Sequence, residues 1–210
     1  MSEFIQEIVL KIFGGSPILA TLFISMIPIV ELRGAIPFGS SKEIWGDKAL
    51  SIFEASVYSI IGSVISAVII LLLLIPIFNF LRKTKFFGTL VESFEEKFKK
   101  QSDKIEDESR ENKNKNLKKW LGVMTFVAIP FPLTGVWTGS AVAVFLQMGF
   151  LKSFSAVSTG ALIAASIMML VSKVLGDKAL YIFYAFGIIF FVLIAFYIIR
   201  AFTKKKKVVE

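Results

Sequence analysis

The chain has 210 residues, of which 55% are hydrophobic, and its 24 Lys and Arg outnumber its 16 Asp and Glu. With a mean hydropathy of +0.73, this composition is typical of helical membrane proteins, and the chain lacks the many short alternating segments of a membrane β-barrel. The absence of Cys and His excludes thiol nucleophiles, Cys/His metal sites, disulfides and imidazole acid–base chemistry.

The first apolar run is interrupted by two charges. Residues 1–13 mix charged and apolar side chains, which predicts an amphipathic helix at the membrane interface. The apolar run 12–30 then ends at Glu31 and Arg33 and resumes over residues 35–39. We expect this segment to enter the membrane and return as a re-entrant hairpin.

A plain spanning segment and a long hydrophilic stretch follow. Residues 56–80 are uncharged and long enough to cross a bilayer, which takes about 20 apolar residues. Within 87–98 the apolar residues recur at helical spacing, which predicts a helix lying on the inner leaflet. Residues 99–119 are highly charged and have no apolar period, so we expect a solvated segment there.

The second half begins with 31 uncharged residues, 121–151, that Pro and Gly residues divide. Two full spans would need about 40 residues, so the segment has the length of two half-helices that enter and return. It resembles the first interruption: Ile-Pro-Ile-Val-Glu-Leu-Arg-Gly at 27–34 is similar to Ile-Pro-Phe-Pro-Leu-Thr-Gly at 129–135. Paired interruptions of this kind indicate a transporter's binding site.

Two further uncharged segments, 153–172 and 179–199, predict two more spans. Basic residues gather in 82–119 and in the tail 204–207, and such loops are usually cytoplasmic. An even number of spans already separates these two stretches, so the hairpin of 121–151 should enter from the cytoplasm. The first hairpin should then enter from outside.

These features predict an all-α, polytopic inner-membrane protein with two opposed re-entrant hairpins, about three spanning helices, interfacial amphipathic helices and an inverted repeat. A single membrane domain covers the chain. It divides into a first hairpin and span (1–81), a cytoplasmic linker (82–119), a second hairpin with two spans (120–203) and a cytoplasmic basic tail (204–210).

Glu31 and Arg33 are the sharpest candidates for a binding site. A charge inside a bilayer costs roughly 2.5–3.5 kcal/mol on insertion scales, so it should face a cavity or a partner. Glu31 could load and release a proton or hold a cation, and Arg33 could hold an anionic group bidentately. The alternatives are an ion pair that pins the hairpin, or a pair at the interface. Pro28 and Gly34 suggest that the backbone is broken around them.

The second candidate cluster is the interruption at 129–139. Pro130 and Pro132 remove backbone donors, Gly135 permits a tight turn, and free amides at a half-helix start could bind an anion. Trp137 could be a gate or stacking surface, or an interfacial anchor. Spacings of small residues predict close helix contacts at four pairs. The pairs are Gly62 with Ser66, Gly139 with Ala143, Gly160 with Ala164, and Ala161 with Ala165.

The chain resembles the small multidrug export protein family in two motifs, Pro28-Ile-Val-Glu31-Leu-Arg33-Gly34-Ala-Ile-Pro37 and Ile129-Pro130-Phe-Pro132-Leu-Thr134-Gly135-Val-Trp137-Thr-Gly139. That family is similar to the DedA/VTT group, whose pattern is two re-entrant hairpins facing each other beside spanning helices. The DedA/VTT resemblance implies lipid movement, including that of undecaprenyl phosphate, and proton-coupled phenotypes. By position, the resemblance carries function to Glu31, Arg33, Pro130, Pro132, Thr134, Gly135 and Trp137.

The sequence thus predicts a transporter that exports small amphipathic molecules, coupled to protons through Glu31. One alternative is a DedA-like translocase of anionic lipid carriers, and another is a non-transporting scaffold acting through residues 82–119. No nucleophile with an orienting base, metal-ligand cluster or phosphate loop indicates an enzyme or a cofactor. The short chain makes a homodimer plausible, and no motif indicates nucleic-acid binding.

Overall fold

The computed structural model describes residues 11–81 and 108–206, and these residues form helices and turns without a strand. The helices are α2 (Pro17–Met26), α3 (Glu31–Gly39), α4 (Lys42–Trp45), α5 (Ile52–Leu81), α7 (Glu108–Ala128), α8 (Val136–Phe145), α9 (Phe150–Leu175) and α10 (Leu180–Lys206). Two 3₁₀ turns, η1 (Gly46–Lys48) and η2 (Gly176–Ala179), precede α5 and α10. The all-α prediction is confirmed for the described part of the chain.

The long helices α5 and α9 pack against each other, and each also packs closely against a further helix at a glycine. A Cβ at Gly62 of α5 would collide with the Leu22 carbonyl of α2, and one at Gly160 of α9 would collide with the Met124 carbonyl of α7. Small residues at such crossings let backbones approach closely. The predicted packing role of both glycines is therefore confirmed.

The two long helices bury corresponding positions. Gly62 and Gly160, for example, each lie ten residues after the first residue of their helix. Seven buried positions of α5 recur in α9 at a constant offset of 98. They are Ala55, Ser59, Gly62, Ser63, Ser66, Ala67 and Ile70, matched by Ser153, Val157, Gly160, Ala161, Ala164, Ala165 and Met168. One packing register serves both helices.

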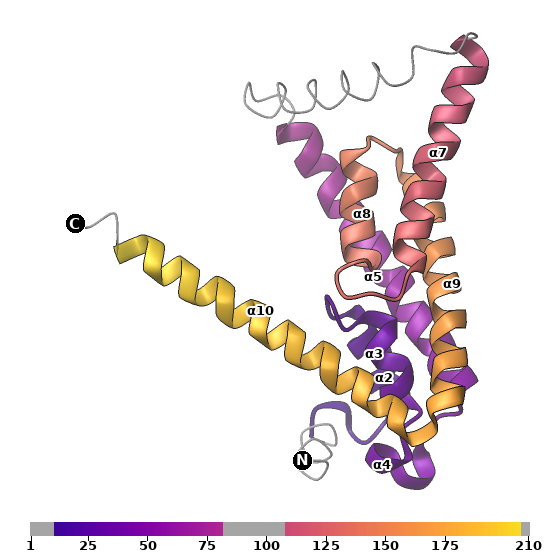
Figure 1. Ribbon diagram of the computed structural model, residues 1–210, viewed down its shortest axis with the longest axis vertical. Helices are drawn as coiled ribbons and strands as arrows, with labels where there is room; N and C mark the ends of the chain where they lie inside the picture. Colours follow the sequence, from indigo (N-terminus) through magenta and orange to yellow (C-terminus); the bar gives the residue numbers. More distant parts are fainter. Residues whose placement is uncertain (1–10, 82–107, 207–210) are drawn as a thin grey trace.

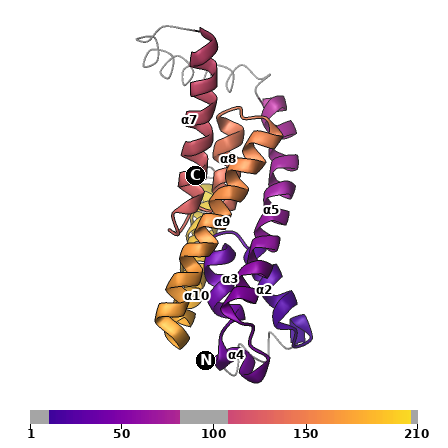
Figure 2. The ribbon, with the colours of Figure 1, turned by 90° about the vertical axis from the view of Figure 1, so that its right-hand side faces the viewer.

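Two helix–turn–helix units lie alongside α5 and α9, with their turns facing each other near the middle of the bundle (Figures 1 and 2). One unit is α2 and α3, joined by residues 27–30, and the other is α7 and α8, joined by residues 129–135. In each turn the residue after a proline has a left-handed backbone, with φ 74° at Ile29 and φ 72° at Leu133. The two turns thus have in common one left-handed residue that follows a proline.

One detail of the first predicted hairpin was wrong. The backbone break covers only residues 27–30, because α3 already begins at Glu31 and continues through Gly34 and Pro37. Pro37 lies inside α3 and has no amide hydrogen, so it cannot donate to the Arg33 carbonyl four residues earlier. Within the segment 99–119 that was predicted to be solvated, residues 116–118 are exposed, but the helix α7, which begins at Glu108, was not predicted. Lys, Glu and Arg are good helix formers, so a charged segment can be helical although it has no apolar face.

By length and composition, two described helical stretches could cross a membrane, Ile52–Leu81 and Phe150–Phe196. The second contains α9, η2 and most of α10, so it covers the last two predicted spans. Near its start α10 packs on α3 through Phe183, whose ring lies 4.7 Å from that of Phe38. The rest of α10 leaves the bundle (Figure 1). The amphipathic helix predicted within 87–98 lies outside the described residues, as do residues 1–10 of the one predicted over 1–13.

Candidate functional site

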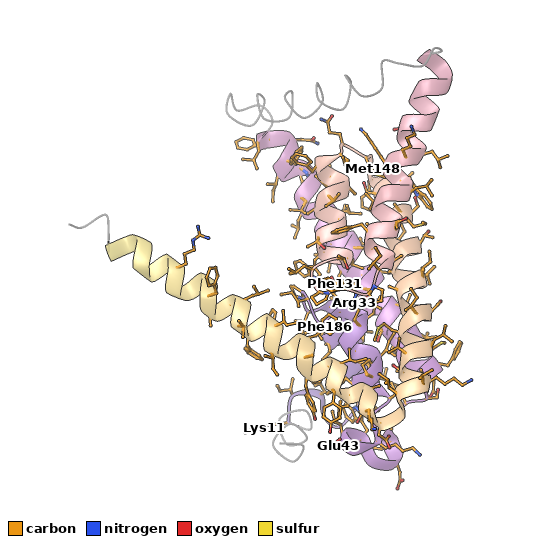
Figure 3. All side chains as sticks on the ribbon, viewed as in Figure 1. Lys11, Arg33, Glu43, Phe131, Met148 and Phe186 are labelled. Carbon is orange, nitrogen blue, oxygen red and sulfur yellow. The ribbon has the colours of Figure 1, made fainter. Side chains whose placement is uncertain are left out.

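The charged pair predicted from the sequence forms a buried ion pair at the start of α3. Arg33 Nη1 donates to Glu31 Oε2 at 3.0 Å, and the two residues are 1% and 2% exposed. Residues two apart on a regular helix point to different sides. Here Glu31 has φ 45°, outside the right-handed helical region, which redirects its side chain toward Arg33. Figure 3 shows Arg33 at mid-height of the bundle.

The Glu31 carboxylate caps the first turn of α8. The amide of Val136 donates to Oε2 at 3.1 Å, and the amide of Trp137 donates to Oε1 at 3.2 Å. The first amides of a helix lack partners within the helix and lie at the positive end of its dipole, so a carboxylate there is stabilised. Gly135 makes this approach possible, because a Cβ at that position would collide with the carboxylate.

The Arg33 guanidinium caps the other arm of the same hairpin, at the end of α7. Nη2 donates to the carbonyls of Val127 at 3.2 Å and Ile129 at 3.0 Å, and to Thr134 Oγ1 at 3.2 Å. The last carbonyls of a helix lie at its negative end, where a cation is stabilised. Two side chains of α3 therefore hold the two ends of the break: Arg33 binds the end of α7, and Glu31 binds the start of α8.

Trp137 adds a further bond between the hairpins. Its Nε1 donates to the carbonyl of Met26, the last residue of α2, at 3.1 Å, and the residue is 38% exposed. Thr134 Oγ1 lies 2.7 Å from the Ile129 carbonyl and 2.8 Å from that of Phe131, which fixes the turn locally. The structure thus brings Glu31, Arg33, Thr134, Gly135 and Trp137 together.

The remaining predicted site residues have other surroundings. Pro28, Pro130 and Pro132 are half-buried in the two turns. Gly34 faces Phe183 of α10, where a Cβ would lie 3.3 Å from the ring. Pro37 lines a separate hollow near the end of α3. These five positions shape the hairpins, whereas the polar contacts come from the residues above.

A comparison with protein families decides where the chain belongs. The family described as "putative small multi-drug export protein" matches residues 31–167, a stretch that begins at Glu31 and contains the whole turn between α7 and α8. The chain belongs to this family. No curated protein and no solved structure matches it. The family description and the two long apolar helical stretches identify a membrane protein of the export class rather than an enzyme.

In this member of the small multi-drug export family, the amides predicted to bind an anion already hold one, the protein's own Glu31 carboxylate. The partners of the charged pair were missed from the sequence because most are backbone groups of Val127, Ile129 and Val136. Any residue type supplies such groups. Gly135, next to the start of α8, was the one residue whose type indicated that another group comes close to these amides.

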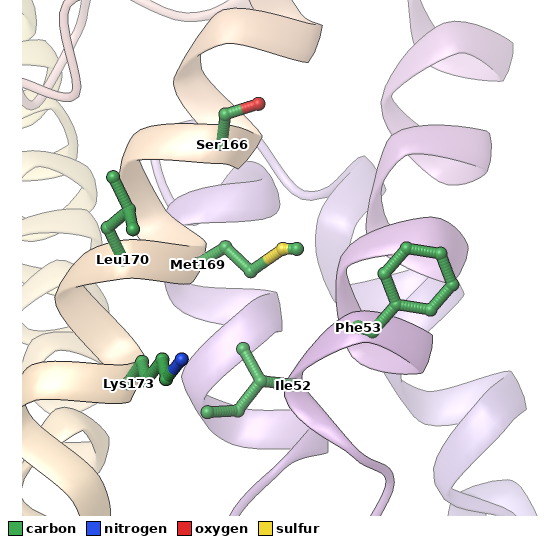
Figure 4. A pocket seen from close by; sticks show the side chains of 6 residues that line it. All are labelled: Ile52, Phe53, Ser166, Met169, Leu170 and Lys173. Carbon is green, nitrogen blue, oxygen red and sulfur yellow. The ribbon is translucent and has the colours of Figure 1, made fainter.

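Two hollows lie near the end of the bundle where α5 begins. The larger, of about 540 Å³, lies between the start of α5 and the end of α9 (Figure 4). Its lining is mainly apolar and comprises Ile52, Phe53, Ser166, Met169, Leu170 and Lys173. The smaller, of about 250 Å³, is lined partly by serines near the end of α3. Within the described residues, no group of three or more acidic side chains could hold a metal ion.

Proposed function

We propose that this protein exports small amphipathic molecules across the cytoplasmic membrane, and that the Glu31–Arg33 pair is the contact that opens and closes the pathway. One observation carries the proposal. Both charges are almost completely buried, and their further hydrogen bonds run to the opposite hairpin. Charged residues inside membrane segments are rare and mark substrate or ion pathways in many transporters.

In the proposed membrane arrangement, the hairpins α2–α3 and α7–α8 are re-entrant, enter from opposite faces and form an inverted repeat with α5 and α9. The left-handed residue after a proline in each turn and the common packing register of α5 and α9 support the repeat. The excess of Lys and Arg in residues 82–119 and in the tail supports a cytoplasmic location for both.

Proton uptake by Glu31 would supply the coupling. A neutral carboxyl group loses its attraction to Arg33 and to the amides of Val136 and Trp137. The contact between α3 and α8 then weakens, and the two hairpins can separate. The freed amides and guanidinium become available to a polar group of the substrate. Release of the proton on the other side restores the closed contact.

A DedA-like translocase of anionic lipid carriers is the second candidate. The groups that hold the Glu31 carboxylate, namely the α8 amides and Arg33, are those that would hold a phosphate. In that case the substrate headgroup replaces Glu31. Substitution of Arg33 should then matter more than substitution of Glu31, and a phosphate lipid should compete with transport.

The test is transport by the purified protein in proteoliposomes with an imposed pH gradient. A fluorescent amphipathic cation reports export, and a labelled polyprenyl phosphate reports lipid movement. Glu31→Gln should abolish proton-driven dye transport. Glu54→Gln is the matched control, because Glu54 is an exposed carboxylate that bonds only to Ser51 among the described residues.

Each outcome separates the candidates. Equal dye transport by Glu31→Gln and the unsubstituted protein would contradict proton coupling through Glu31. Lipid movement without dye transport would favour the translocase. If the folded protein moves neither substrate, the remaining alternative is the scaffold acting through residues 82–119.

A further inference from the structure

A row of serine hydroxyls runs along the buried side of α5. Ser59, Ser63 and Ser66 are 0–3% exposed, and none of their hydroxyls finds a hydrogen-bond partner within the described residues. Positions separated by three and four residues share one face of a helix. Ser56, one turn earlier, shows the usual alternative, since its hydroxyl donates to the Ile52 carbonyl at 2.7 Å.

Packing alone does not require these hydroxyls. At the same register in α9, the residues that match Ser59, Ser63 and Ser66 are Val157, Ala161 and Ala164. Alanine therefore meets the need for a small side chain in one helix, while serine meets it in the other. An unsatisfied hydroxyl in an apolar interior is unfavourable, so the α5 hydroxyls need polar partners. Internal water supplies such partners where several polar groups line a site.

The smaller hollow lies at the start of α5, before the row of hydroxyls. That hollow is lined by Ser40 and Ser51 and by Ser172, whose hydroxyl is almost fully buried and also lacks a partner within the described residues. The start of α5 is fixed beside the end of α3 there, because the Leu50 amide donates to the Gly39 carbonyl at 3.0 Å. This bond sets a common level from which both helices lead toward the middle of the bundle.

The helical rise places the row beside the charged pair. Along α3, Arg33 and Glu31 lie about 9 and 12 Å from Gly39, at 1.5 Å per residue. Along α5, which packs against α3, Ser59 lies about 10 Å from Ile52 at the same rise. Ser59 therefore reaches the level of the pair, and Ser63 and Ser66 lie about 6 and 10 Å further along α5. Arg33 Nε is itself buried without a partner among the described residues.

We infer that the serine face of α5, from Ser59 to Ser66, lines a hydrated seam that meets the Glu31–Arg33 pair at Ser59, and that water and protons reach the pair along it. Each serine hydroxyl both donates and accepts, so it can continue a chain of water hydrogen bonds without binding a bulky ion. The role of the seam in delivering protons rests on the proposed function, whereas its hydration does not.

Silver ions test the hydration, because Ag⁺ is small and reacts with thiols that water reaches. The variants Ser59→Cys and Ser63→Cys are compared with Ala161→Cys, which lies at the α9 position matching Ser63 and is 0% exposed. The chain has no other Cys. Each variant, in lipid nanodiscs, is exposed to Ag⁺, quenched and unfolded, and its remaining thiol is counted with a fluorescent maleimide.

The α5 thiols should react at least tenfold faster than the thiol at position 161. Equal rates at Ser63→Cys and Ala161→Cys, fast or slow, would overturn the inference. Ser66→Cys replaces either α5 variant that does not fold as a single species. The silver reaction requires water at the thiol but no transport. Its result therefore does not depend on whether the unsubstituted protein transports the dye.

Discussion

The carboxylate of Glu31 fills the space that a side chain at residue 135 would need, so Gly135 and Glu31 fit each other across the two hairpins. Gly135 has φ −86° and ψ −160°, an extended backbone that any residue adopts. Its lack of a side chain, and not its backbone freedom, is what the contact uses. The carboxylate reaches the amides of α8 only because nothing stands in front of them.

Gly135→Ala should therefore push the carboxylate away from α8. Hydrogen bonds to a charged group contribute about 1.5–3 kcal/mol each, so a loss of about 2 kcal/mol or more in the free energy of unfolding is expected. An SDS titration of the purified protein measures it. Gly122→Ala in α7 is the control, because a Cβ there meets open space, and it should be neutral or slightly stabilising. Equal behaviour of the two variants would contradict the contact.

The ion pair should show strong coupling in a double-mutant cycle. Arg33→Met leaves a buried carboxylate without its cation, and removal of one partner of such a pair costs about 3–5 kcal/mol. Combining Arg33→Met with Glu31→Gln removes both charges, so the double variant should be less destabilised than the two single effects added together. Additive effects on the free energy of unfolding would show that the two charges do not interact.

The sequence was sufficient for the three long apolar helices and for the location of the two turns. Apolar runs predicted α5, α9 and α10, and Pro28, Pro130 and Pro132 marked the two turns. The start of α7 at Glu108 was missed because a charged helix without an apolar face has no hydrophobic period to detect. Its helical state depends on propensity and on continuation into the apolar residues that follow.

The site was predictable only in part. Glu31 and Arg33 stood out because charges are rare in apolar runs, and their position at the junction follows from the turns on either side. Their bonding partners could not be read, because an amide of Val136 or a carbonyl of Val127 looks like any other in a sequence. The left-handed backbone at Glu31, which lets the pair form, also gives no signal in a non-glycine residue.

The two matched glycines of the long helices should respond alike. Gly62→Ala and Gly160→Ala each place a Cβ against a backbone carbonyl of the neighbouring helix, so each should destabilise by about 1–3 kcal/mol, as overpacking does. Gly187→Ala in α10 is the control, since nothing lies within 4 Å of a Cβ there. Thermal unfolding in detergent orders the three variants. Tolerance of Ala at either position 62 or 160 would contradict the shared register.

Leu133 offers a test of backbone strain in the second turn. It is 50% exposed and has φ 72°, a region that costs non-glycine residues roughly 1–2 kcal/mol. Leu133→Gly should therefore be neutral or stabilising by up to about 1 kcal/mol, despite the lost apolar contacts. Leu133→Val, which adds a β-branch, should be destabilising in the same thermal assay. The reverse order of the two variants would show that the turn is not strained.

The two hairpins contribute different groups to their contact, so each hairpin can pair with the other but not with a second copy of itself. The α2–α3 unit contributes both charges, and the α7–α8 unit contributes both helix ends that receive them. Two units of the first kind would bury carboxylate against carboxylate, and two of the second would leave helix ends without a counter-charge. Halves of this chain made as separate polypeptides should therefore assemble with each other and not with themselves, so that the same few bonds specify heteromeric pairing within one lipid bilayer.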